Sequence, residues 1–351
     1  MKRFIIPLLL VSLAGQAQMA APLPKGLIST IAFGSCAEET APQPVLDLVV
    51  KHKPELFIYL GDNIYGDTKD MKELKAKYDS LTAKPEFQRL KKAVPLLATW
   101  DDHDYGWNDT GKYYPYKTES KKLFLDFFNE PVNSERRRRE GIYTSYIFEG
   151  NGRKLQIILL DNRTFRNDLR IYRGELSREA KYFYPLDYYP HQIEDSALLG
   201  EAQWKWLEGE LQKPADLRII GSGSQFGIEY NGYEAWANFP HEQKRFLELV
   251  KKTKASGVMF ITGDVHYAEI SKLETPGLYP IYDITSSGIT STWLFPTPNK
   301  NRIEGPVMDN HFGLLSIDWT KKDPTIKMEI WDLRDNQRIE YSIKLSDISF
   351  K

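Results

Sequence analysis

The feature that most constrains the fold is a short apolar run at residues 56–60, which ends at the polar turn Gly-Asp-Asn-Ile-Tyr of residues 61–65. A short apolar run bounded by turn residues is typical of a buried strand. Open α/β sheets bind their ligands at the carboxyl ends of strands. Asp62 therefore stands where such a sheet would hold a metal ion, and Tyr65 is close enough in sequence to reach the same point.

The residues before this turn predict a parallel pair of strands. An apolar run at 28–33 is followed by a helical pattern at 43–52 and then by the run at 56–60. A strand–helix–strand order predicts a parallel pair joined by a right-handed crossover. Both strands then end at the same edge of the sheet, which brings Cys36 close to Asp62.

The rest of the chain continues this alternation. Apolar runs predict further strands at 94–99, 142–148, 155–160, 217–221, 257–262, 279–284, 313–319, 326–331 and 338–345, and helical spacing predicts helices at 70–81, 118–128, 200–211 and 240–253. Asn151-Gly152 is a strong signal for a hairpin turn. With no visible repeat or domain boundary, the expected fold class is α/β: an αββα sandwich of two packed mixed sheets flanked by helices.

The first 17 residues have the pattern of a signal peptide, with Lys2 and Arg3 before an apolar run and small residues near the cleavage point. A membrane anchor is the alternative, but the apolar run is short for a span. We therefore expect export by the general secretory route to the periplasm or the medium, and a mature single domain at 18–351 without a transmembrane segment. The net charge of −1 gives no support for nucleic-acid binding.

Three other segments carry weaker predictions. Residues 164–199 are irregular and rich in aromatic side chains, and this length indicates a functional or decorative insertion beside the site. The run Arg136–Arg139 is interpreted as a solvated surface loop. Trp107 is interpreted as a core residue, with a role in walling the site as the alternative.

Polar side chains follow five of the predicted strands. They are Cys36, Asp62 with Asn63, Asp102 with His103, Gln225, and Asp264 with His266. A single Asp after a strand is usually a turn or helix cap. The repetition of such residues after five strands indicates a metal site, because thiolate, carboxylate and imidazole are the side chains that bind metals.

This order resembles that of the calcineurin-like metallophosphoesterases and, more closely, the alkaline phosphatase D (PhoD-like) family, over about residues 28–320. In that family the Gly-Asp-x-x-Tyr turn supplies a bridging aspartate and an iron-binding tyrosinate, positions matched by Asp62 and Tyr65. The resemblance implies that Cys36, which stands where many relatives have Asp-x-His, also binds iron. It implies that His103 is the catalytic histidine.

Departures from the wider superfamily pattern indicate two unlike metal sites. Cys36, Asp62, Tyr65 and His266 form the first set, and the second comprises Asp62, Asp102, Asp264 and the Gln225 amide, with a neighbouring carbonyl as the alternative to that amide. Free tyrosine has a pKa of about 10, so a phenolate beside a thiolate favours Fe³⁺. Oxygen ligands favour Ca²⁺, Mg²⁺ or Mn²⁺ over zinc, and the resemblance makes Ca²⁺ the first choice.

The resemblance also implies a mechanism, in which a metal-activated hydroxide attacks a phosphate ester. His103 would stabilise developing charge or protonate the leaving oxygen, and Asp104 could orient it. Asn63 would donate a hydrogen bond to the phosphate. Arg163, in an Asp-x-Arg sequence, would grip the phosphate, with a structural salt bridge to Asp161 as an equal alternative.

The sequence therefore predicts a secreted metal-dependent phosphohydrolase, an alkaline phosphatase or phosphodiesterase, acting on small or polymeric phosphate esters. A phospholipase-like phosphodiesterase is one alternative, which turnover of a nitrophenyl monoester, its bis-ester and a phospholipid would separate. A non-catalytic domain that keeps its metals for structure is the other. The presence of His103 argues against it.

Overall fold

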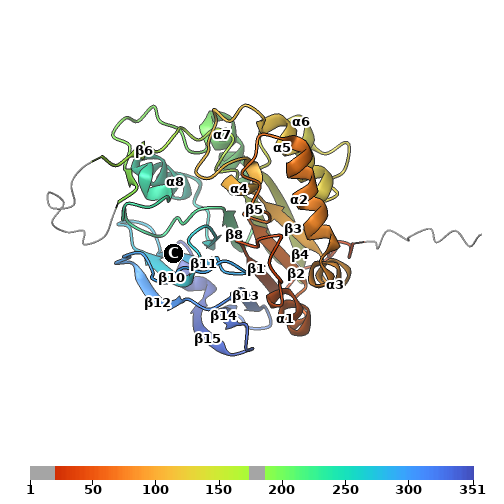
Figure 1. Ribbon diagram of the computed structural model, residues 1–351. Coiled ribbons are helices and arrows are strands. Elements are labelled where there is room, and N and C mark those ends of the chain that lie inside the picture. Colours follow the sequence, from red (N-terminus) through yellow and green to blue (C-terminus); the bar gives the residue numbers. More distant parts are fainter. Residues whose placement is uncertain (1–19, 174–185) are drawn as a thin grey trace, which may run out of the picture.

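Two mixed β-sheets form the centre of the molecule (Figure 1). The computed structural model describes residues 20–173 and 186–351. The predicted signal peptide at 1–17 and the part of the predicted insertion at 174–185 lie outside these residues. Within the described residues no helix is both long enough and apolar enough to span a membrane.

The first sheet has six strands among the described residues, in the order β15-β14-β13-β1-β2-β3. They are β1 (Thr30–Gly34), β2 (Leu56–Leu60), β3 (Leu96–Thr99), β13 (His311–Asp318), β14 (Thr325–Asp332) and β15 (Gln337–Lys344). β1, β2 and β3 run parallel, which confirms the predicted parallel pair.

The second sheet has seven strands in the described part of the chain, in the order β12-β10-β11-β9-β8-β5-β4. They are β4 (Thr144–Gly150), β5 (Arg153–Leu159), β8 (Leu217–Ser222), β9 (Val258–Thr262), β10 (Ala268–Leu273), β11 (Ile281–Ser286) and β12 (Arg302–Val307). β5, β8, β9 and β11 are parallel neighbours. The carboxyl ends of parallel strands therefore gather at one edge in each sheet.

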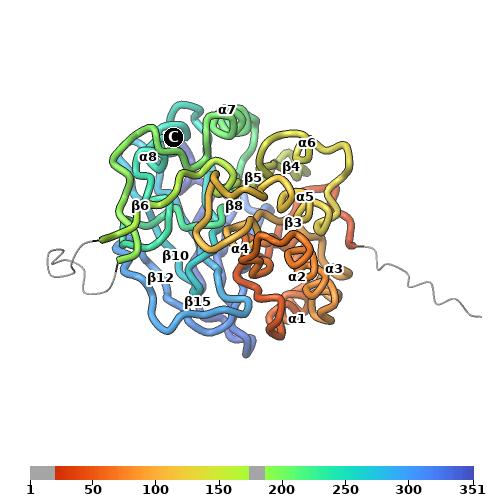
Figure 2. Tube along the Cα trace, turned by 45° about the horizontal axis from the view of Figure 1, so that its top comes forward, coloured from red at the N-terminus to blue at the C-terminus, as the bar shows by residue number. Residues whose placement is uncertain are grey.

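Helices cover the outer face of each sheet, and Figures 1 and 2 show the two groups on opposite sides of the molecule. On the six-stranded sheet lie α1 (Val45–His52), α2 (Met71–Ala83), α3 (Pro85–Ala93) and α5 (Lys117–Phe127), and on the seven-stranded sheet lie α7 (Gly200–Leu211) and α8 (Pro240–Thr253). The short helices are α4 (Asp102–Tyr105) and α6 (Glu135–Arg138). This is the predicted αββα sandwich.

β2 shows why an uninterrupted apolar run belongs in this position. All five of its side chains are buried. Ile58 packs in the core between the sheets, whereas Tyr59 packs in the core under the helices. Because successive side chains of a strand point to opposite faces, only a strand covered on both sides needs an apolar residue at every position.

Local turn chemistry confirms the β4–β5 hairpin. Asn151 and Gly152 have φ values of 51° and 74°, as a type I′ turn requires. The sequence missed α3, β10 and β12, the short helices α4 and α6, and the two-residue strands β6 (Arg170–Ile171) and β7 (Tyr188–Tyr189) in the stretch predicted to be irregular. β12 contains Pro306 and lies at the edge of its sheet, where a residue without a backbone donor is tolerated but weakens the strand signal.

Two predictions about single segments were wrong. Arg136 belongs to α6 and is buried, donating to the carbonyl oxygens of Ala98 and Ile142, so the arginine run is not simply a solvated loop. Trp107 is not a core residue, because 49% of its surface is exposed.

Shortening Ile58 to alanine should destabilise the protein by about 2–5 kcal/mol, because the change leaves a cavity between the sheets. Urea-induced unfolding measures the loss. Ile147 on β4 is 43% exposed, so Ile147→Ala is the matched control and should cost less than about 1 kcal/mol. Equal losses in the two variants would contradict the assigned core.

Candidate metal centre

Three turns at strand ends bring a thiol, a carboxylate and an imidazole together. Cys36 follows β1, Asp62 follows β2 and His266 follows β9, and one ligand atom from each lies within 4.8 Å of the other two. The Cys36 sulfur is 3.3 Å from Asp62 Oδ2. The Tyr65 hydroxyl is 3.4 Å from His266 Nε2. The four residues predicted for the first metal are thus neighbours.

Backbone geometry at these turns is unusual. Cys36, Asp62, Asp264 and His266 have positive φ values of 59°, 50°, 79° and 57°. Residues other than glycine rarely adopt this region, and such strain tends to collect at functional sites. Backbone bonds hold the first two turns together, since the N–H groups of Cys36 and Ala37 donate to the carbonyls of Gly61 and Asp62.

Two glycines allow the strand ends to approach so closely. A Cβ on Gly61 would lie 2.4 Å from the Asp101 side chain, and a Cβ on Gly263 would lie 2.5 Å from the Ser35 hydroxyl. Gly61 also has a φ of 110°. A larger residue at either position would push the turns apart.

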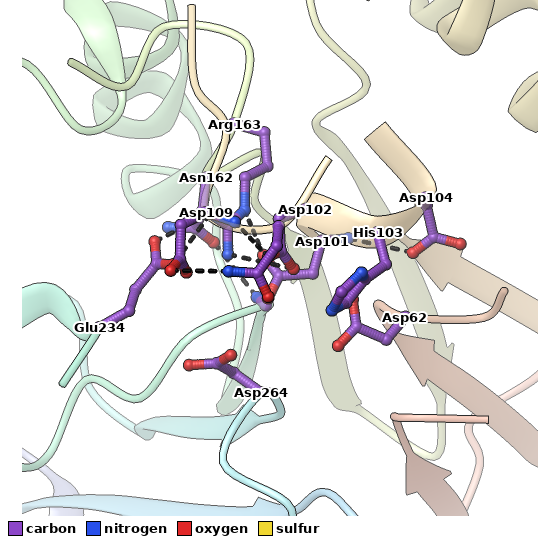
Figure 3. Close-up of polar contacts among 12 residues, drawn as sticks. Asp62, Asp101, Asp102, His103, Asp104, Asp109, Asn162, Arg163, Glu234 and Asp264 are labelled. Atoms are coloured by element: carbon purple, nitrogen blue, oxygen red, sulfur yellow. Dashed lines mark hydrogen bonds and ion pairs between the residues drawn. The ribbon is translucent and has the colours of Figure 1, made fainter. Parts of the chain in front are cut away.

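Asp102 and His103 also lie close to Asp62 (Figure 3). Ligand atoms of these three residues form a second group within 4.8 Å of one another. Asp62 therefore belongs to both groups. A carboxylate with two oxygens in this position can bridge two cations, as predicted for Asp62.

Asp67 contacts the imidazole of His103 directly. Its carboxylate oxygens are 2.9 and 2.8 Å from Nδ1. One of them also accepts a hydrogen bond from the backbone N–H of Asn108. Burial by itself would lower the pKa of His103, but Asp102, Asp62 and Asp67 raise it to about 10. The ring is therefore both oriented and poised to carry a proton.

Asp104 and Asn63 link the turns after β2 and β3. The Asp104 carboxylate accepts hydrogen bonds from the backbone N–H groups of Asn63 and Asp101. The Asn63 amide donates to the carbonyl of Thr99, and its Oδ1 has no hydrogen-bond partner among the described residues. Asp104 thus fixes the backbone around the site, whereas Asp67 makes the direct contact to His103.

Arg163 lies at the centre of a buried ion-pair network (Figure 3). Its Nε is 2.6 Å from Asp101 and its Nη1 is 2.8 Å from Glu234. Nη2 lies 3.7 Å from Asp102 and has no hydrogen-bond partner within the described residues. The side chain of Arg163 pairs with Asp101 and Glu234, whereas Asp161 accepts a hydrogen bond from the backbone N–H of Arg163.

Asp264 and Gln225 lie on the side of the seven-stranded sheet. Asp264 reaches the site from the turn after β9, opposite Asp101 and Asp102 in Figure 3. The Gln225 amide nitrogen donates to Glu269 and Thr285, while its Oε1 is buried without a hydrogen-bond partner in the described residues. An amide held in this way presents its oxygen as the remaining acceptor.

A comparison with protein families tests the resemblance to the PhoD-like family that the motifs suggested. Residues 31–308 match the model of the PhoD-like phosphatase family. The chain belongs to the PhoD-like phosphatase family. The match spans the whole seven-stranded sheet, the parallel strands of the six-stranded sheet and every predicted metal ligand, and it ends before β13.

Individual relatives of this PhoD-like chain are distant. It is 23% identical to alkaline phosphatase D of Bacillus subtilis (strain 168) over 288 residues, which is 70% of this chain but 47% of that protein. The match thus spans about half the length of the curated relative. The solved structure of PhoD has a TM-score of 0.66 at 16% identity, covering 92% of this chain and 73% of that one. A dimetal phosphatase from Danio rerio has a TM-score of 0.57 at 13% identity, covering 91% and 99%. At these identities the solved structures show a shared fold.

The donor set of this PhoD-like site fits metal ions. Oxygen atoms of Asp62, Asp102 and Gln225 are buried without a hydrogen-bond partner in the described residues. Burial and the charges of neighbouring acids raise the pKa of Asp62 and of Asp264 well above the usual range. Packed anions without compensating charge are unfavourable. Bound cations would supply the missing charge.

Sequence reasoning missed three acidic residues at the site: Asp67, Asp109 and Glu234. The backbone N–H of Asp109 donates a hydrogen bond to the Asp102 carboxylate, and the Asp109 carboxylate accepts a hydrogen bond from the hydroxyl of Tyr188, which belongs to the predicted insertion. The described part of the insertion thus reaches the site. Each missed acid sits in an irregular loop, where no periodic pattern singles out one carboxylate from another.

Metal binding should release protons and tighten as pH rises. Burial raises the pKa of the Cys36 thiol, and burial with nearby acids raises that of the Tyr65 phenol, so both are protonated near neutrality and must lose their protons to bind a cation. Burial lowers the pKa of His266 to about 4, so it contributes no proton. Titrating metal-free protein with Co²⁺ in weak buffer, with a pH indicator, measures the release.

Cys36→Ser provides the comparison for this titration, because a serine hydroxyl keeps its proton. The variant should release fewer protons and show a shallower dependence of affinity on pH. An affinity for Co²⁺ that is unchanged between about pH 6 and about pH 9 in the unaltered protein would contradict the ligand assignment.

Proposed function

We propose that this protein is an exported metal-dependent phosphohydrolase that hydrolyses phosphate monoesters, diesters or both. The observation that carries this proposal is the sharing of Asp62 between two groups of ligand atoms, one with Cys36 and His266 and one with Asp102 and His103. Two cations beside a shared carboxylate are a recurrent arrangement for phosphoryl chemistry. Membership of the PhoD-like phosphatase family supports the same activity.

The two metal sites take different ions in this proposal. Cys36, Tyr65, Asp62 and His266 bind Fe³⁺, because a thiolate and a phenolate stabilise a highly charged ion. Asp62, Asp102, Asp264 and the Gln225 amide bind Ca²⁺, with Mg²⁺ or Mn²⁺ as the alternatives for an oxygen-rich site. When bound, these ions supply Lewis-acid charge for the phosphate and lower the pKa of a water molecule.

The protein's own groups then hold the ester and move the proton. His103, oriented by Asp67 at 2.8 Å, donates a proton to the leaving oxygen as its bond to phosphorus breaks. Asp104 contributes by fixing the turn that carries His103. Asn63 and the unpaired Nη2 of Arg163 are the proposed phosphate contacts, and the other nitrogens of Arg163 hold Asp101 and Glu234 in place.

Export follows from the signal-peptide pattern of residues 1–17. The catalytic unit in this proposal is one domain over residues 18–351, which includes the aromatic insertion at 164–199. The contact between Tyr188 and Asp109 supports placing that insertion beside the site.

Purified protein should contain iron together with one other metal, which is divalent. It should be coloured, because Fe³⁺ bound to a tyrosinate or a thiolate absorbs visible light. Elemental analysis and a visible spectrum test this directly. Tyr65→Phe should remove most of the band while retaining the second metal, and Asp62→Asn should lower the content of both metals.

Tyr59→Phe is the matched control for the spectrum. Tyr59 is also fully buried but packs under the helices, so its loss should leave the colour unchanged. A colourless protein that contains only zinc would overturn the metal assignment, and a metal-replete protein that turns over no phosphate ester would overturn the proposed activity.

Replacing His103 with alanine should preserve both metals and reduce kcat by about 10²–10⁴-fold, the usual contribution of a positioned acid. Asp67→Asn should have a smaller effect on kcat. It should also move the alkaline limb of the kcat/KM profile to lower pH, because removing a negative charge lowers the pKa of His103. Steady-state kinetics from about pH 6 to about pH 11 measure both changes.

His52→Ala serves as the control for these kinetics, since His52 lies on α1 and bonds to Asp335. It should leave kcat and the pH profile unchanged. An unaltered kcat in the His103 variant would remove that residue from the mechanism, and an unaltered alkaline limb in the Asp67 variant would remove Asp67 as its partner.

A further inference from the structure

Three consecutive large apolar residues lie on the surface after β11. Leu294 is fully exposed, Phe295 is half exposed, and Trp293 is partly exposed. Single exposed apolar residues are ordinary on a protein surface, but consecutive ones usually mark a binding site. The position of this segment relative to the metal centre indicates what it binds.

Backbone hydrogen bonds tie this segment to two of the predicted metal ligands. Thr290 and Ser291 donate their N–H groups to the carbonyl oxygen of Cys36, at 3.0 and 3.3 Å. Trp293 donates to the carbonyl oxygen of His266 at 3.0 Å. The exposed side chains are therefore held at a fixed place beside the centre, with few rotatable bonds between the two.

Ring contacts continue from the centre to this surface. The Tyr65 ring lies 4.3 Å from that of His103 and 6.5 Å from that of His266, between ring centres. The Trp293 ring lies 5.5 Å from that of His266 and 6.1 Å from that of Phe295, with which it is stacked at 27°. An aromatic wall thus extends from the proposed proton donor to the solvent. Leu294 belongs to none of these ring contacts.

We propose that Trp293 and Phe295 form a subsite for the leaving group, and that it favours phosphate esters of aromatic alcohols. This inference rests on the proposed phosphohydrolase function. The stacked pair offers a flat apolar face, which suits an aromatic ring through offset or edge contacts. An ester whose phosphate lies at the centre would place its leaving group against this wall, while a small polar alcohol would gain little from it.

The selectivity between two substrates tests this subsite. Trp293→Ala and Phe295→Ala should each lower kcat/KM for phenyl phosphate by about threefold to tenfold, the usual value of an aromatic contact. For glycerol phosphate, kcat/KM should change by less than about twofold. Trp293→Phe should restore much of the selectivity, since it keeps an aromatic face.

Inhibitors that cannot be hydrolysed provide a second measurement that does not involve turnover. Phenylphosphonate and methylphosphonate carry the same anionic group, but only the first has a ring. In competition experiments, Trp293→Ala should weaken the binding of phenylphosphonate by the same factor by which it lowers kcat/KM for phenyl phosphate. The binding of methylphosphonate should be unaffected. Equal losses for both phosphonates, or for both esters, would overturn the subsite.

Leu294→Ser is the matched control. It removes the most exposed apolar side chain without altering a ring contact, so the selectivity should be unchanged. If selectivity instead stays constant in the Trp293 and Phe295 variants while Leu294→Ser abolishes binding to phosphatidylglycerol vesicles, the patch is a membrane contact and the proposal is wrong. An unaltered protein that hydrolyses neither these monoesters nor diesters such as bis(4-nitrophenyl) phosphate would refute the proposed function rather than the subsite alone.

Discussion

The buried carboxylate of Asp62 is the constraint on which the rest of the site depends. It belongs to one group of ligand atoms with Cys36 and His266 and to another with Asp102 and His103, and it is almost completely removed from water. Charge buried in this way is unfavourable unless a partner of opposite sign is close. The pKa of Asp62 is raised because no such partner offsets its burial and the neighbouring acids. Bound cations are the partners that fit the available donor atoms.

The fold meets this constraint by using the ends of parallel strands from two sheets. Short, strained turns after β1, β2 and β9 carry the ligands inward, and buried apolar strands behind them hold the turns in place. Arg163 balances part of the negative charge through Asp101 and Glu234. The rigid frame therefore limits the relaxation that would otherwise let the anions move apart.

The fold alone does not decide the reaction, because one architecture supports many activities. The solved structures of PhoD and of the Danio rerio dimetal phosphatase are 16% and 13% identical to this chain. What distinguishes this site is its particular side chains: a thiol and a phenol near one histidine, oxygen donors on the other side, and an aromatic wall that leads from the centre to the surface.

Much of the fold could be predicted because its signals are local. The apolar run at 56–60 and the Asn151-Gly152 turn each specify a structure within a few residues, and the parallel β1–β2 pair then brings Cys36 to Asp62. Arg136 was misjudged because a charged run looks solvated in sequence, whereas three hydrogen-bonding groups in the fold allow it to be buried.

The sequence by itself determined the alternation of strands and helices and the residue types that end the strands, because periodicity and turn chemistry act between near neighbours. Only the tertiary structure decided that Asp67 contacts His103, that Arg163 joins Asp101 to Glu234, and that Trp293 lies against His266. These partners are far apart in sequence or lie in irregular loops. Packing of the complete molecule is what selects one carboxylate or ring among many of the same kind.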